Sequence, residues 1–185
     1  MLPYAHFADA LPYAEFFAKF GTSKDKPRWD LTKSLVAPTE AQTLTLKSFV
    51  RETHILVLAG AWCGDCASQC PILEKFAELA PSLKVRYLDR DAYPEAQKEL
   101  QINGGNRVPV AVFFSEDGQE VARFGERTLT AYRMLIQNLS GESCGSGIVT
   151  ANAHFAGVVQ DWLDQIERVQ AILRLSPRLR RLHGD

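Results

Sequence analysis

The sequence has no apolar run approaching the roughly 20 residues that a helix needs to cross a bilayer. Its first residues carry neither the basic nor the apolar segment of a secretory signal, so we expect a protein of the cytoplasm. Neither sign of charge is in excess, because 21 Lys and Arg stand against 22 Asp and Glu. The formal net charge of −1 gives no reason to expect a nucleic acid or an anionic membrane as partner.

Cysteine is also scarce. Four cysteines in 185 residues are too few for the disulfide framework of small secreted domains. There is one Cys-x-x-Cys, with no second such pair, no histidine pair at metal-ligand spacing and no internal repeat. In a reducing compartment a single Cys-x-x-Cys is typical of a catalytic or metal-binding site rather than of a structural bridge.

What the chain does contain is a junction at residues 59–66, Ala-Gly-Ala-Trp-Cys-Gly-Asp-Cys. An apolar, β-branched run before it predicts a buried strand at 54–60, and apolar residues at helical spacing after it predict a helix at 66–79. Cys63 and Cys66 therefore lie at a helix start, where unpaired N–H groups and the helix dipole favour a thiolate. Two adjacent thiols in such a place form a thiol–disulfide exchange site.

The rest of the chain alternates helices and strands. The predicted elements are helices at 10–20, 29–36 and 39–52, the strand and helix just named, a strand at 83–89, a helix at 93–100, strands at 108–114 and 120–124, and helices at 128–139 and 151–175. Thr39 is the expected N-cap of its helix, with Gln42 completing a capping box. The β-α-β part should be parallel and the closing hairpin antiparallel, which gives an α/β fold with a mixed sheet between helices.

Three motifs coincide: Trp-Cys-x-x-Cys after an apolar strand, a proline (Pro71) five residues beyond the second cysteine, and Val-Pro opening a later strand before a hairpin. Together they resemble the thioredoxin superfamily. The nearest likeness is to bacterial thioredoxin-like proteins with a Trp-Cys-Gly-Asp-Cys site and an Asn-Gly-Gly…Pro segment, here residues 62–66 and 103–109. The resemblance covers roughly 39–139 and implies a single thioredoxin-like domain over 1–185. Around that core we expect a helical extension at 1–38, a flexible loop at 140–150 and a C-terminal helix at 151–176. The basic tail at 178–183 is expected to be frayed.

The resemblance implies a role for each residue of the motif. Cys63 would attack a substrate disulfide, and Cys66 would resolve the mixed disulfide. Pro109 is expected to be cis, which would place the backbone of Val108 beside Cys63 to pair with an extended substrate. Trp62 would flank the same substrate-binding groove.

The chain departs from ordinary thioredoxins at two places. Val57 stands where they carry a buried acid, and Gly64-Asp65 replaces the usual Gly-Pro between the cysteines. We assign Gly64 and Asp65 to tuning the pKa of the dithiol. The Asp65 carboxylate opposes a nearby thiolate by about as much as the helix terminus favours it, so we expect a Cys63 pKa modestly below that of a free thiol.

These features predict a disulfide reductase that needs no organic cofactor and no metal. Its substrates would be disulfide-containing proteins or small disulfides, and its electrons would come from an upstream reductase or a low-molecular-weight thiol. A disulfide isomerase, or a thioredoxin-fold binding module with weak redox activity, stays open as an alternative. Cys63, Cys66 and Cys70 could also supply three thiolates to a metal, with a fourth ligand from Cys144 or a histidine.

The two remaining cysteines each leave two readings open. Cys70 is expected to be a core thiol, with an auxiliary redox partner as the alternative. Cys144 is either an incidental thiol or a regulatory or resolving cysteine that the loop brings to Cys63. We assign no histidine a catalytic role.

Overall fold

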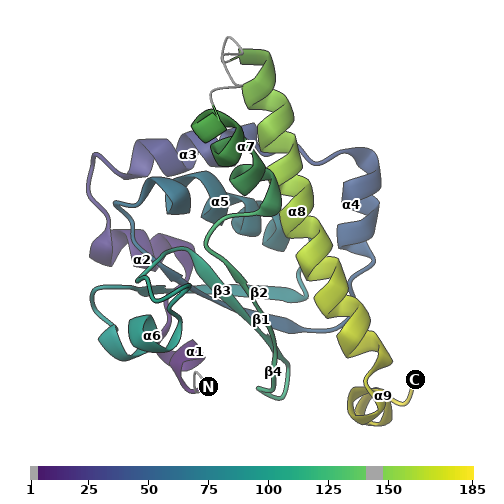
Figure 1. The fold of residues 1–185 in the computed structure, drawn as a ribbon. Helices are drawn as coiled ribbons and strands as arrows, with labels where there is room; N and C mark the ends of the chain where they lie inside the picture. Colours follow the sequence, from purple (N-terminus) through teal and green to yellow (C-terminus); the bar gives the residue numbers. More distant parts are fainter. Residues whose placement is uncertain (1–3, 141–147) are drawn as a thin grey trace.

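The computed structural model describes residues 4–140 and 148–185, with side chains for 4–137 and 154–185. Its centre is a four-stranded sheet in the order β2-β1-β3-β4 (Figure 1). Strand β1 (Thr53–Ala59) pairs in parallel with β2 (Leu83–Asp89) and antiparallel with β3 (Val110–Ser115), and β3 pairs antiparallel with β4 (Glu120–Gly125). The predicted mixed sheet is confirmed.

Helices surround this sheet. They are α1 (His6–Asp9), α2 (Tyr13–Phe20), α3 (Lys26–Leu35), α4 (Glu40–Lys47), α5 (Gly64–Leu79), α6 (Pro94–Glu99), α7 (Leu129–Ser140), α8 (Ile148–Leu175) and α9 (Pro177–His183). Helices α3, α5 and α8 lie over one face of the sheet, and α1 and α6 lie on the other side (Figure 1). None of the helices within the described ranges is both long and apolar enough to span a membrane.

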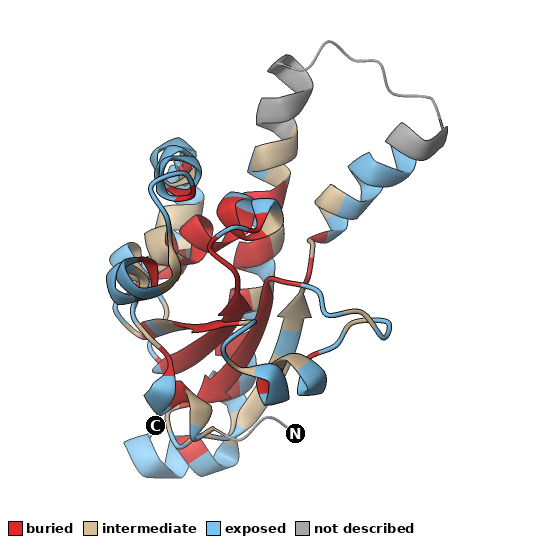
Figure 2. Ribbon diagram, turned by 90° about the vertical axis from the view of Figure 1, so that its left-hand side faces the viewer, coloured by how far each residue is buried: buried red, intermediate tan, exposed pale blue. Residues whose placement is uncertain are grey.

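The two central strands are buried along their whole length, whereas β4 is only partly covered (Figure 2). A strand covered on both faces needs apolar residues at every position, which explains the unbroken run Ile55–Ala59. Alternate side chains of β1 then face opposite helix layers. Val57 and its neighbour Tyr87 on β2 face α5, while His54 stacks on Phe7 of α1.

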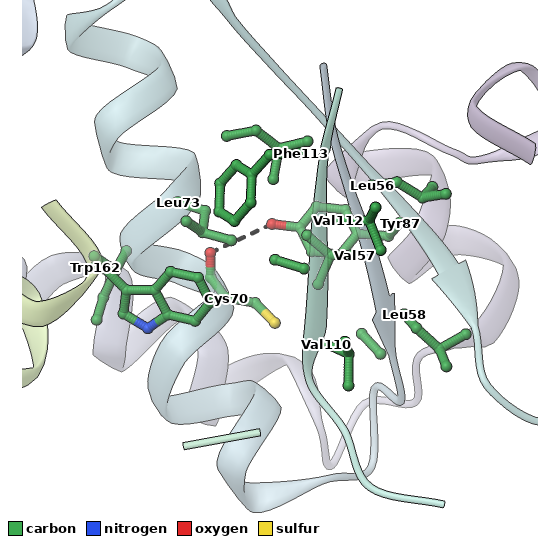
Figure 3. Close-up of a cluster of buried hydrophobic side chains, with 14 of the residues drawn as sticks. Leu56, Val57, Leu58, Cys70, Leu73, Tyr87, Val110, Val112, Phe113 and Trp162 are labelled. Carbon is green, nitrogen blue, oxygen red and sulfur yellow. Dashed lines mark hydrogen bonds between the residues drawn. The ribbon is translucent and has the colours of Figure 1, made fainter. Parts of the chain in front are cut away.

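The core on the α5 side joins segments far apart in the sequence (Figure 3). Tyr87 is fully buried and its hydroxyl donates a hydrogen bond to the Cys70 carbonyl at 3.3 Å. Trp162 of α8 is also fully buried, and its ring meets that of Phe124 edge-on at 4.8 Å. Helix α8 is therefore part of the core, rather than an unpartnered amphipathic helix.

Local sequence signals account for several element ends. Thr39 and Gln42 form the predicted capping box at the start of α4. That helix ends at Lys47, however, before the predicted residue 52, because Ser48 and Phe49 turn the chain toward β1. The ranges of β1 and β2 agree with the prediction within one residue.

The predicted frayed tail is wrong. Residues 177–183 form α9, because the Ser176 side chain caps its first turn and Leu179 is fully buried. Arg178 also pairs with Asp117 at 2.6 Å. The predicted flexible loop at 140–150 is only partly testable, since 141–147 lie outside the described residues. Its flanks belong to α7 and α8.

Candidate functional site

The dithiol lies where β1 ends and α5 begins. Ala59 is the last residue of β1, and Cys63 is the N-cap of α5 in an extended conformation, with φ −77° and ψ 128°. The Cys63 N–H donates to the Gly60 carbonyl at 3.0 Å, and the Cys63 carbonyl accepts the N–H of Ala67 at 2.9 Å. The turn between strand and helix is thereby closed, which places the Cys63 side chain at the helix N-terminus, as predicted.

The two thiols differ in exposure. Cys63 keeps 8% of its surface exposed, whereas Cys66 is fully buried. The Cys63 thiol donates to the Val108 carbonyl at 3.6 Å. The Val108–Pro109 peptide bond is cis, and both this bond and the position of Val108 beside Cys63 agree with the prediction.

The direction of the predicted Cys63 pKa is wrong. A hydrogen bond with Cys66 and burial raise the pKa of Cys63 above that of a free thiol, against smaller lowering by the backbone N–H groups of Cys66 and Asp65. Burial likewise raises the pKa of Cys66. The predicted pKa depended on Asp65 and the helix terminus alone, whereas the low-polarity surroundings and the second thiol have the larger effect.

Asp65 has a partner that the sequence argument did not include. Arg127 donates from Nε to Asp65 Oδ1 at 3.2 Å and from Nη2 to Oδ2 at 2.5 Å. The carboxylate is therefore neutralised by a two-point ion pair. Gly64, by contrast, has open space where a Cβ would stand, so nothing in its surroundings requires glycine.

A charged cluster next to the dithiol was not predicted. Glu126 is only 3% exposed and accepts hydrogen bonds from Arg107 at 2.6 Å, Arg127 at 2.9 Å and the Tyr132 hydroxyl at 3.0 Å. The pairing of the two hairpin strands could have indicated this cluster. Antiparallel pairing sets Val110 opposite Gly125, so the residues after β4 must lie beside those before β3.

Trp62 flanks the dithiol and is 47% exposed. The Arg90 guanidinium lies over its ring at 4.5 Å, and Arg28 donates to its carbonyl at 3.1 Å. A Cβ at Gly60 would come within 2.8 Å of the indole, so glycine there lets the ring pack against the backbone. Trp62 thus stays partly exposed at the position directly before Cys63.

The remaining residues considered in the sequence are the other two cysteines, the possible metal ligands and Val57. Cys70 is fully buried in the core, as expected, and Cys144 lies outside the described residues. Cys63, Cys66 and Cys70 are free thiols. Within residues 4–140 and 148–185, no group of three or more His, Cys, Asp or Glu is arranged to hold a metal ion. Val57 is fully buried among apolar neighbours.

Comparison with known proteins identifies a family that this chain matches. A family model described as thioredoxin matches residues 12–140, so the match begins well inside the predicted N-terminal extension. A curated thioredoxin from Chlamydia muridarum is 36% identical over 62 residues, covering 34% of this chain and 57% of that relative. The chain therefore spans little more than half the length of this curated relative.

Two solved structures share the fold over most of the chain. A Pseudomonas aeruginosa protein of unknown function superposes with a TM-score of 0.67 at 18% identity, covering 88% of this chain and 98% of that one. A scaffold carrying an HIV epitope superposes with a TM-score of 0.64 at 18% identity, covering 86% and 97%. Both likenesses concern the fold alone.

Proposed function

Since this chain belongs to the thioredoxin family, we propose that it is a thiol–disulfide oxidoreductase that reduces disulfide bonds with Cys63 and Cys66. The observation that carries the proposal is the position of Cys63. The residue lies at the N-terminus of α5 and keeps 8% of its surface exposed, and its thiol is next to the backbone of Val108. Cys66 is one helical turn away and hydrogen-bonded to it, without exposure of its own.

The reaction follows from this difference in exposure. The Cys63 thiolate attacks one sulfur of a substrate disulfide, forming a mixed disulfide and releasing the other sulfur as a thiolate. Cys66 then loses its proton and attacks Cys63, which forms the Cys63–Cys66 disulfide and releases the second substrate thiol. The substrate gains two electrons, and the dithiol loses two. An extended substrate segment would lie along Val108 and Pro109, with Trp62 at its side.

The surroundings of the dithiol favour reduction over oxidation. Burial and the hydrogen bond between the two sulfurs raise the pKa of Cys63, so the reduced form gains little from thiolate stabilisation. Pairs whose thiolate is strongly stabilised are oxidants, and the opposite arrangement gives a reductant. We place the reaction in the cytoplasm, with an upstream reductase or a low-molecular-weight thiol as donor. The dithiol itself is the redox group.

Two measurements test the proposal. Pre-reduced wild-type protein should reduce a protein disulfide stoichiometrically, while the Cys63→Ser variant should not. The Cys66→Ser variant should accumulate a mixed disulfide at Cys63, which mass spectrometry detects. Cys70→Ser serves as the matched control and, once folded, should reduce the disulfide as the wild type does.

The reduction potential separates reductase from isomerase. We expect equilibration in glutathione or dithiothreitol buffers, read by mass, to give a value near the reducing, thioredoxin-like end of about −270 mV. A value near the oxidising end would overturn the reductase assignment and favour an isomerase. Activity that persists in Cys63→Ser would overturn the site itself.

A further inference from the structure

Asp65 places a negative charge between the two cysteines, in the first turn of α5. An unpaired carboxylate there would oppose the ionisation of Cys63, because two negative charges close together at the helix N-terminus repel each other. In the structure both carboxylate oxygens are occupied by the Arg127 guanidinium, at 2.5 and 3.2 Å. The two side chains are 35% and 24% exposed, so solvent screens the pair only in part.

Arg127 is itself held in place from the other side. Its Nη1 donates to Glu126 Oε1 at 2.9 Å, and that buried carboxylate also accepts from Arg107 at 2.6 Å. The Glu126 carbonyl accepts a hydrogen bond from Gln69 of α5 at 2.8 Å. The residues joining β4 to α7 are thus attached to the active-site helix one turn below the dithiol.

The cluster is balanced in charge. Asp65 and Glu126 supply two negative charges, and Arg107 and Arg127 supply two positive ones. Removing either member of the Asp65–Arg127 pair leaves one uncompensated charge beside Cys63, and removing both restores the balance.

We propose that Arg127 is a positioning residue for the Cys63 nucleophile: its guanidinium neutralises Asp65, so that the acidic residue between the cysteines does not suppress the thiolate. The consequence for disulfide reduction rests on the proposed function, but the effect on Cys63 does not. The hydrogen bonds of Arg127 in the structure go to Asp65 and Glu126 and not to either sulfur, so it acts through Asp65.

The size of the effect follows from Coulomb's law. A unit charge about 6 Å from the sulfur, at an effective dielectric constant of about 40, shifts a pKa by about one unit. In Arg127→Gln the unpaired Asp65 should raise the Cys63 pKa by about this amount. In Asp65→Asn the cluster keeps one net positive charge, because Arg127 and Arg107 then share Glu126, and the Cys63 pKa should fall by a similar amount. The double variant should titrate close to wild type.

The experiment is a double-mutant cycle read as the rate of iodoacetamide alkylation against pH, with peptide mass mapping to isolate Cys63. We expect the midpoint to move up in Arg127→Gln, down in Asp65→Asn and back to within about 0.3 units in the double variant. Below the midpoint, the alkylation rate of Arg127→Gln should be about tenfold slower than wild type. Arg127→Lys keeps the positive charge and should stay near wild type.

The matched control is Arg123→Gln. Arg123 is also paired with acids, Glu120 at 2.7 Å and Glu99 at 3.2 Å, but it lies on β4 outside the cluster. Its loss should leave the midpoint unchanged. A circular dichroism spectrum of each variant establishes that it is folded.

Two results would overturn the proposal. One is a folded Arg127→Gln or Asp65→Asn variant with an unchanged Cys63 midpoint, which would reduce the pair to a structural link. The other is a double variant whose midpoint stays displaced. If the wild-type protein reduces no disulfide, the proposed function fails, yet the alkylation midpoints still decide the role of Arg127.

Discussion

Helix α5 (Gly64–Leu79) carries the same residue type in opposite settings, at its first turn, here called the reactive end, and from its middle onward, here called the core end. At the first turn, Cys63 contacts the Val108 carbonyl and keeps part of its surface exposed, and the charged cluster of Asp65, Arg127, Glu126 and Arg107 lies beside it. Two turns further on, Cys70 is enclosed by Tyr87, Trp162 and apolar strand residues (Figure 3). One helix therefore holds a reactive thiol and an inert one, and their surroundings make the difference.

The largest expected difference between the two settings comes from replacing each thiol in turn by serine. Cys63→Ser should abolish disulfide reduction, because a hydroxyl cannot replace the thiolate nucleophile. Cys70→Ser should retain nearly the full rate per folded molecule, and should lose about 1–3 kcal/mol of stability from a buried hydroxyl. Turnover with a protein disulfide and urea unfolding check both. A Cys70→Ser protein that is folded but inactive would contradict the division of roles.

The core end should be the more sensitive one in stability. Phe76 lies on the same helix and is fully buried. Phe76→Ala should reduce the free energy of unfolding by about 3–5 kcal/mol, through lost burial and the cavity left behind. The alkylation midpoint of Cys63 should not change in the remaining folded protein. A displaced midpoint would mean that the two ends of the helix are coupled.

At the core end, Glu74 should make the free energy of unfolding depend on pH. Burial raises its pKa, which the hydrogen bond from Tyr87 at 2.8 Å and the charge of Lys33 offset only in part. Between the ordinary glutamate pKa and this raised value, the folded protein binds more protons than the unfolded chain. The contribution of Glu74 to stability is therefore complete below that window and is lost as pH rises through it.

Glu74→Gln removes this titration and keeps an oxygen that can accept from Tyr87. We expect the free energy of unfolding of wild type to fall relative to the variant as pH rises through the window, measured by urea unfolding at a series of pH values. Parallel curves for the two proteins would show that Glu74 does not couple protonation to folding.

The smallest expected effect concerns the reactive end. Gly64 has nothing within 4 Å of where its Cβ would be, and its φ is not positive. Gly64→Ala should therefore stabilise the protein by about 0.4–1 kcal/mol through reduced freedom of the unfolded chain. The Cys63 midpoint should stay within about 0.3 units of wild type if Asp65 and Arg127 control it. A larger shift would restore Gly64 as a tuning residue.

Much of this arrangement could be predicted from local patterns. The unbroken apolar run of β1, the capping box of Thr39 and Gln42, and the junction at Cys63 each depend on neighbours within a few residues. The position of Val108 beside Cys63 came from the family resemblance, since no local pattern joins residues 45 apart in sequence.

The errors share a physical cause. Asp65 was predicted to have no ion-pair partner, because Arg127 lies 62 residues further along the chain. The Cys63 pKa was predicted in the wrong direction because burial is a property of the packed fold. The C-terminal tail has the composition of a frayed segment, and only Leu179 entering the core and Arg178 pairing with Asp117 make it a helix.

The N-terminal segment pairs with the sheet at a single residue, and this pairing affects how the protein behaves in solution. Leu11 exchanges two backbone hydrogen bonds with Tyr87, at 2.8 and 2.9 Å, on the side of β2 away from β1. Pro12 follows at once and has no N–H, so the pairing cannot extend. The chain thus covers its own sheet edge at that point. A version truncated before α2 would leave β2 open to strands of other molecules, and should self-associate at concentrations where the full chain does not.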